Sequence, residues 1–254
     1  MRRRARRKLV IVMNARGGVR LAVGVLLLML TALLMTQDVP ASRTWSYWTL
    51  PLSGKIVVID AGHGGIDGGA TSQSGLVEKD LNLTIALQVR DFLQEAGALV
   101  YLTREGDYDL AGADTAVIRR RKTEDLLKRV ELIKDRRANL VVSIHMNSIP
   151  QQQWSGAQTF YYPNHPDNFA LAALIQEEIR RNMENTSRQA NTANTVYLLK
   201  ALEDMPTALV EVGFLSNPGE AQQLGNPDYQ HKMAASIYQG ILRFSSGERL
   251  QAAP

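Results

Sequence analysis

The chain has 254 residues, of which 45% are hydrophobic and 21% are charged, a composition typical of a globular protein with one sizeable core. It contains no cysteine, which excludes disulfides, thiolate metal ligands, cysteine nucleophiles and lipid attachment through cysteine. The net charge of +4 arises in the first 41 residues, which carry +7, so the remaining residues carry −3. This mildly acidic body argues against a basic surface for nucleic acid, and no nucleic-acid partner is expected.

The first 41 residues have the layout of an export signal. An arginine-rich stretch precedes an almost unbroken apolar run over residues 21–35, and a cleavage site is predicted after Ala41. As a helix this run spans roughly 22 Å, less than the roughly 30 Å of a membrane core, although the preceding glycines can extend it. A cleaved signal peptide and a retained membrane anchor both fit, and either exports the protein. Met13 opens a more compact leader and is an alternative start of translation.

Residues 42–54 are expected to form a linker whose aromatic residues either pack on the domain or face the membrane interface: Trp45, Tyr47 and Trp48. From Lys55 onward, apolar runs typical of strands alternate with segments of helical periodicity. Strands are predicted over residues 55–60, 98–103, 140–145, 157–162, 196–199 and 207–212, and helices over 79–96, 115–137, 166–183 and 229–244. This alternation predicts a single α/β domain over residues 55–246 with a largely parallel sheet, followed by a tail over 247–254.

Four residues occupy positions that suggest chemistry. His63 lies in the glycine-rich loop after the first strand and His145 ends the third strand, so both belong at the carboxyl edge of the sheet, where ligands bind. Glu78 opens the following helix, where its position alone favours a carboxylate stabilised by the helix dipole over a ligand. Glu211 is flanked by apolar residues. An unpaired carboxylate there is costly to bury, and burial raises its pKa toward the range of a general base.

Two histidines and one glutamate are the ligand set typical of catalytic zinc, which keeps one coordination position for water. A further carboxylate would then carry the proton from water to the leaving nitrogen. The alternative for His145 is a hydrogen-bonded core residue. The loop around His63 lacks the pattern of a phosphate-binding loop, and no nucleophile elbow occurs. The basic run over residues 119–122 is followed by acids, as on a solvated helix face.

Five segments, in order along the chain, resemble the successive signatures of the N-acetylmuramoyl-L-alanine amidases: residues 59–65, 78–82, 103–104, 143–147 and 209–217. The resemblance implies zinc held by His63, Glu78 and His145, with Glu211 as the catalytic acid and base. It also implies a central, mostly parallel six-stranded sheet flanked by helices, and peptidoglycan as the substrate. The family pattern has proline where this chain has Ala61, a change that removes no ligand.

Within this family, residues 45–54, 153–158 and 185–190 resemble the germination-specific amidases of endospore formers. Those enzymes act in making muramic-δ-lactam of the spore cortex, which implies a place at the outer membrane face, in the cell wall or in the cortex space. An activating partner protein stays open. Two other functions stay open as well, a catalytically silent wall-binding protein and a zinc peptidase acting within the stem peptide. The Trp154 loop and residues 191–194 are candidate glycan or peptide contacts, or plain surface loops.

Overall fold

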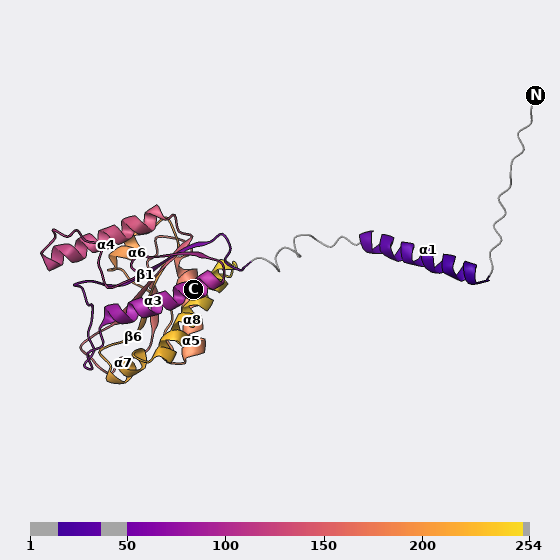
Figure 1. Ribbon diagram of the computed structural model, residues 1–254. Coiled ribbons are helices and arrows are strands. Elements are labelled where there is room, and N and C mark those ends of the chain that lie inside the picture. Colours follow the sequence, from indigo (N-terminus) through magenta and orange to yellow (C-terminus); the bar gives the residue numbers. More distant parts are fainter. Residues whose placement is uncertain (1–14, 37–49, 251–254) are drawn as a thin grey trace, which may run out of the picture. The chain divides into compact units, whose positions relative to one another are not determined.

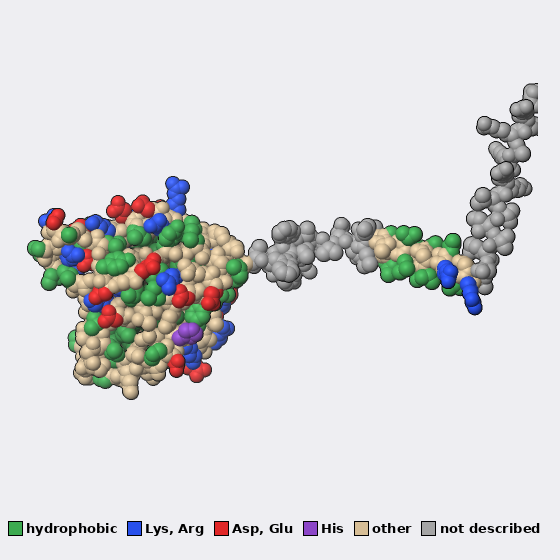
Figure 2. Space-filling view, viewed as in Figure 1, with side chains coloured by type: hydrophobic (Ala, Val, Ile, Leu, Met, Phe, Trp, Pro, Cys, Tyr) green, Lys and Arg blue, Asp and Glu red, His purple; other side chains and the backbone are tan. Residues whose placement is uncertain are grey.

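The computed structural model describes residues 15–36 and 50–250, which belong to two separate units, 1–49 and 50–254 (Figure 1). In the first unit, helix α1 (Ala15–Thr36) is long and apolar enough to cross a membrane. Its 22 residues span about 33 Å, and its apolar side chains between Val19 and Leu33 are exposed (Figure 2). A signal sequence has the same properties. The predicted cleavage site, the alternative start and the three aromatic residues of the linker lie outside the described residues.

The second unit contains a six-stranded sheet with the order β2-β1-β3-β6-β4-β5. Its strands are β1 (Ile56–Ala61), β2 (Leu99–Leu102), β3 (Leu140–Asn147), β4 (Gln158–Tyr161), β5 (Asn191–Thr192) and β6 (Thr207–Phe214). Strands β2, β1, β3 and β6 are parallel, whereas β4 runs antiparallel to β6. The predicted α/β fold with a mostly parallel six-stranded sheet is confirmed.

Helices cover both faces of this sheet (Figure 1). They are α3 (Glu78–Glu95), α4 (Ile118–Asp135), α5 (Asn168–Met183), α6 (Tyr197–Ala201), α7 (Pro218–Leu224) and α8 (Pro227–Ser245). Because side chains alternate along a strand, Val57 and Ile59 join the core under α3, α5 and α8. Val58 points the other way and packs with Ile133 of α4 and Leu198 of α6. The helical layers thus explain why β1 is apolar on both faces.

Two short segments differ from the sequence prediction. Residues 196–199 were predicted as a strand and instead begin helix α6, with Leu198 and Leu199 both buried. A short apolar run does not distinguish a strand from a buried helical turn, which explains the error. The sixth strand is β5, whose Asn191 and Thr192 are exposed and polar and give no strand pattern. Helix α7 was not predicted, although Asn217 caps it and Pro218 opens it.

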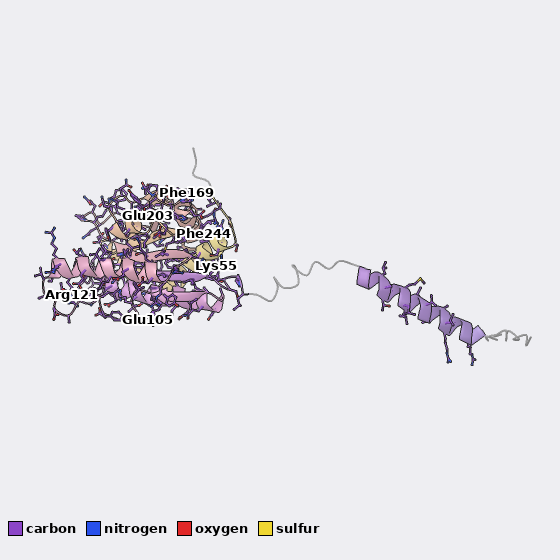
Figure 3. The ribbon with its side chains drawn as sticks, turned by 90° about the horizontal axis from the view of Figure 1, so that it is seen from above. Lys55, Glu105, Arg121, Phe169, Glu203 and Phe244 are labelled. Atoms are coloured by element: carbon purple, nitrogen blue, oxygen red, sulfur yellow. The ribbon has the colours of Figure 1, made fainter. Side chains whose placement is uncertain are left out.

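The folded unit begins before Lys55. Leu52 lies in the predicted linker but is completely buried, and its N–H donates to the carbonyl of Ala96 at 2.9 Å. Seen from above, Lys55, which precedes β1, and Arg121 of α4 lie toward opposite ends of the domain (Figure 3). The parallel strands therefore start near Lys55 and end at the opposite edge, where the candidate site lies.

Candidate metal centre

Three of the predicted site residues converge at the carboxyl edge of the sheet. His63 lies in the loop after β1, Glu78 is the first residue of α3, and His145 lies near the end of β3. One ligand atom from each lies within 4.8 Å of the others. Glu78 Oε1 is 3.1 Å from His63 Nε2 and 3.1 Å from His145 Nδ1. These three side chains form a candidate metal site.

The donor set and its spacing fit a zinc-sized ion. Zinc binds imidazole nitrogens and carboxylate oxygens at about 2.0–2.2 Å, so two of its ligands lie roughly 3–3.6 Å apart. The 3.1 Å contacts agree with that spacing. Burial alone would lower the pKa of His63, but the carboxylates of Asp67 and Glu78 raise it to about 9. The site therefore attracts positive charge, which a divalent cation also supplies.

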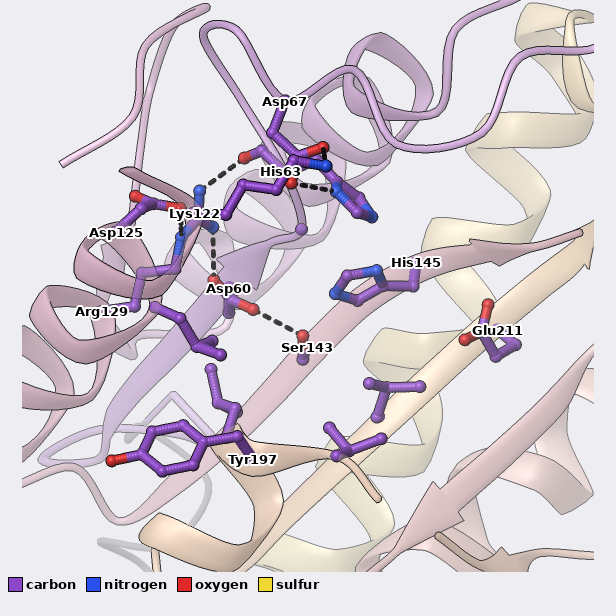
Figure 4. A pocket seen from close by; sticks show the side chains of 15 residues that line it. Asp60, His63, Asp67, Lys122, Asp125, Arg129, Ser143, His145, Tyr197 and Glu211 are labelled. Carbon is purple, nitrogen blue, oxygen red and sulfur yellow. Dashed lines mark hydrogen bonds and ion pairs between the residues drawn. The ribbon is translucent and has the colours of Figure 1, made fainter. Parts of the chain in front are cut away.

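Asp67 fixes the orientation of His63. Its Oδ2 lies 2.9 Å from His63 Nδ1, which leaves Nε2 directed to Glu78. Lys122 of α4 holds the other oxygen of Asp67 at 2.7 Å (Figure 4). A carboxylate behind a metal-binding histidine sets its tautomer and ring orientation. Lys122 thus lines the site while its side chain stays exposed, as expected for a basic run on a solvated helix face.

Two buried arginines hold the loop that carries His63, which has a positive φ of 62°. Arg129 donates to the carbonyl of Ala61 at 2.7 Å and to that of His63. Arg104 donates to the carbonyls of Ala61 and Gly62 at 2.9 and 3.0 Å. Because a guanidinium presents several donors in a fixed plane, each arginine fixes two neighbouring carbonyls. Arg104 lies in residues 103–104, one of the segments that resemble the amidase signatures. Arg129 was not predicted to belong to the site.

Asp60 links three strands beneath this loop. It accepts hydrogen bonds from Ser143 Oγ at 2.6 Å and Thr103 Oγ1 at 2.7 Å, and it pairs with Arg129 at 2.9 Å. Burial alone would raise its pKa, but Arg129 and His145 and the two hydroxyls lower it to about 2. The carboxylate therefore stays charged and joins β1, β2, β3 and α4. From the sequence alone, Asp60 could be predicted only as an acid at the end of a strand.

Gly62 makes room for the imidazole of His145. A Cβ added at Gly62 would lie 2.3 Å from the Cε1 and Nε2 atoms of that ring, far inside van der Waals contact. The carbonyl of Gly62 also accepts from Asn82 Nδ2 at 3.1 Å. Close packing of the loop on the ring therefore requires glycine here.

Glu211 lies beside this cluster and keeps an unpartnered oxygen. It is the register partner of His145 across β6 and β3, and both side chains line a pocket of about 310 Å³ together with His63 (Figure 4). Its Oε2 is buried and has no hydrogen-bond partner among the residues that the structure describes. Burial raises the pKa of Glu211 to about 7. The structure thus brings all four predicted site residues together.

Among the residues that the structure describes, a His–Glu–His cluster lies beside a buried carboxylate oxygen without a hydrogen-bond partner, an arrangement typical of metal-dependent hydrolases. Residues 57–243 match the sequence profile of the family described as N-acetylmuramoyl-L-alanine amidase. The chain belongs to this family, and the predicted membership is confirmed. It is 55% identical, over 201 residues, to the germination-specific N-acetylmuramoyl-L-alanine amidase of Bacillus subtilis, with 79% of this chain and 84% of that protein covered.

Solved structures agree with this assignment. The fold is similar to that of the CwlD amidase from Clostridioides difficile, whose structure is a complex with the GerS lipoprotein; the TM-score is 0.74 at 40% identity, over 77% of this chain and 100% of that one. The catalytic domain of CwlV, an N-acetylmuramoyl-L-alanine amidase from Bacillus (Paenibacillus) polymyxa, has a TM-score of 0.65 at 33% identity, over 75% and 97% of the two chains.

Proposed function

We propose that this protein is a zinc-dependent hydrolase of the amide bond between N-acetylmuramic acid and L-alanine in peptidoglycan. His63, Glu78 and His145 hold the zinc, and Glu211 is the catalytic acid and base. The single observation that carries the proposal is the buried Glu211 Oε2, which has no hydrogen-bond partner within residues 15–36 and 50–250, beside a complete ligand set. A structural carboxylate would be expected to find partners for both oxygens, because leaving a buried acceptor unsatisfied is costly.

Bound zinc supplies a Lewis acid that polarises the amide carbonyl and acidifies water. Glu211 takes a proton from the attacking water as its oxygen bonds to the carbonyl carbon of the lactyl group. The same carboxyl then gives that proton to the nitrogen of L-alanine as the carbon–nitrogen bond breaks. A pKa near 7 suits both halves of this transfer. The products are a free muramic carboxyl group and a stem peptide with a free amino end.

The biological setting is a finer part of the proposal. The 55% identity to a germination-specific amidase supports action on the spore cortex during sporulation or germination. The apolar helix α1 near the N-terminus supports export, as a signal or as an anchor at the outer membrane face. Either arrangement delivers the catalytic domain to peptidoglycan in the cell wall or the cortex space.

A partner protein is a further part of the proposal. One solved relative at 40% identity is a complex with a lipoprotein, which supports an exported lipoprotein partner for this chain as well. The proposal predicts that the purified protein loaded with zinc turns over slowly and that an extract of sporulating cells raises its rate. Full activity of the purified protein would rule out a required partner.

Product analysis tests the proposed reaction against its alternatives. The full chain in detergent micelles is incubated with zinc and denuded sacculi, and the soluble products are analysed by mass spectrometry. The amidase releases stem peptides that begin at L-alanine and leaves a free carboxyl on muramic acid. Cleavage within the stem would identify a zinc peptidase. No release, with zinc bound and cell extract added, would leave a silent wall-binding protein.

A further inference from the structure

The loop between β3 and β4 presents a tryptophan that is held from several sides. The N–H of Gly156 donates to both oxygens of the Glu220 carboxylate, at 2.9 and 3.1 Å. Asn217 Nδ2 donates to the carbonyl of Trp154 at 3.3 Å, and Arg188 Nη2 donates to that of Ser155 at 3.2 Å. Glu220 is itself buried. The backbone around Trp154 is therefore fixed before any ligand binds.

The side chain of Trp154 remains 46% exposed despite this anchoring. The guanidinium of Arg188 lies 5.5 Å from the centre of the Trp154 ring and 5.4 Å from that of Phe214. Its hydrogen bonds, to the carbonyl of Ser155 and to Gln158 Oε1, are long at 3.2–3.4 Å. A rigid aromatic surface beside a guanidinium with weakly engaged donors is typical of a binding site.

This cluster continues the row of side chains that forms the candidate site. Gln158 of β4 is the register partner of Glu211, and Glu211 is that of His145. Side chains opposite each other on neighbouring strands share one face of a sheet, and the strands lie about 4.8 Å apart. Arg188, which contacts Gln158, therefore lies close to the same face, next to the carboxylate proposed to act on the substrate.

The chemistry of the cluster suits a sugar. The apolar C–H face of a pyranose ring packs on an exposed indole, and the guanidinium and amide donors match an acetamido carbonyl and ring hydroxyls. The carboxylate of Glu220 is buried and bound to backbone N–H groups, so it does not repel a ligand. We propose that Trp154 and Arg188 form a platform for an N-acetylated sugar of the glycan strand adjoining the reacting muramic acid, an inference that rests on the proposed function.

Binding to a glycan tests the platform without catalysis. The full chain in detergent micelles is titrated with a β-1,4-linked tetramer of N-acetylglucosamine, and the Kd is measured by ligand-observed NMR. Trp154→Ala is expected to raise the Kd about fivefold or more, whereas Trp154→Phe keeps most of the affinity. Leu99→Ala is the matched control, because Leu99 is 51% exposed at the start of β2, at the opposite edge of the sheet. Equal Kd values for wild type and Trp154→Ala overturn the proposal.

Kinetics on two substrates separate a sugar contact from a structural or peptide contact. One substrate is a muramoyl peptide without neighbouring sugars, and the other is the same peptide on a tetrasaccharide. Trp154→Ala is expected to lower kcat/KM about fivefold or more on the tetrasaccharide only. Equal losses on both substrates contradict the platform. If neither substrate is hydrolysed, with zinc bound and an extract of sporulating cells added, while tetramer binding still depends on Trp154, the proposed function fails and the platform stands.

Discussion

His145 and Glu211 lie directly opposite each other on the parallel strands β3 and β6, with their side chains on the same face of the sheet. His145 belongs to the His–Glu–His cluster, and Glu211 carries a buried oxygen with no hydrogen-bond partner in the described part of the chain. Strand pairing therefore sets the separation of the candidate ligand and the candidate acid and base. Loop movements in a parallel sheet would leave this relationship unchanged.

Asp67 is expected to be needed for tight metal binding. Asp67→Asn removes the charge that orients His63 through its Nδ1, and loss of such a partner typically weakens metal affinity by about 10- to 100-fold. The zinc Kd, measured by competition with a chromogenic chelator, checks this. Lys122→Ala, which removes only the cation behind Asp67, should have a smaller effect. Unchanged affinity of Asp67→Asn would contradict the orienting role.

Arg129 is expected to stabilise the fold and the loop. Arg129→Met leaves the buried carboxylate of Asp60 without its cation, and breaking a buried ion pair in this way costs about 3–5 kcal/mol. Chemical denaturation of the metal-free protein measures the change in the free energy of unfolding. Arg120→Ala is the matched control on the exposed side of α4, where changes of about 0.5 kcal/mol or less are expected. Similar losses for both variants would refute this account.

Gly62→Ala should abolish the metal site. The new methyl group would meet the His145 ring at 2.3 Å, so the ring or the loop must move and the three ligand atoms would separate. Zinc content after dialysis, determined by mass spectrometry, is expected to fall far below one ion per chain. Gly219→Ala in α7 is the control, because its Cβ meets nothing closer than 3.4 Å. A Gly62→Ala protein that retains zinc would show that the ring has room to spare.

The stability of the fold should respond to the titration of Asp60. Its folded pKa of about 2 lies below the ordinary value of 3.8, so its stabilising contribution is fully present above pH 4 and is lost as the pH falls toward 2. The lowered pKa corresponds to about 2 kcal/mol. Carbon-13 NMR of the Asp60 carboxyl in the metal-free protein measures the midpoint directly. A midpoint near 3.8 would show that the buried network does not hold the charge.

The layered fold follows from local patterns, because buried strands and amphipathic helices repeat apolar residues at their own periods. The exceptions are short. Residues 196–199 have an apolar run that fits either a strand or the start of helix α6, and Asn191 and Thr192 become a strand through pairing with β4 alone. In the site, His63 and His145 could be placed at strand ends, and Glu211 by its apolar neighbours.

Other site residues depend on contacts between distant segments. Arg129 pairs with Asp60, which lies 69 positions earlier in the chain. The many charged residues of α4 predict a solvent-exposed helix and do not indicate a buried arginine. Glu78 looks like an ordinary helix-start carboxylate, and only resemblance to the amidase family indicated a ligand. The orienting role of Asp67 depends on a turn with positive φ at His63, which glycines suggest but do not specify.

The most direct test of the central claim compares zinc-loaded wild type with Glu211→Gln on the same denuded sacculi. Zinc content is measured first, so that loss of the metal and loss of the proton carrier are distinguished. The account predicts one zinc per chain in both proteins and a decrease in stem-peptide release of at least about 100-fold in the variant. Release at the wild-type rate by zinc-loaded Glu211→Gln would contradict the assignment of Glu211 as the catalytic acid and base.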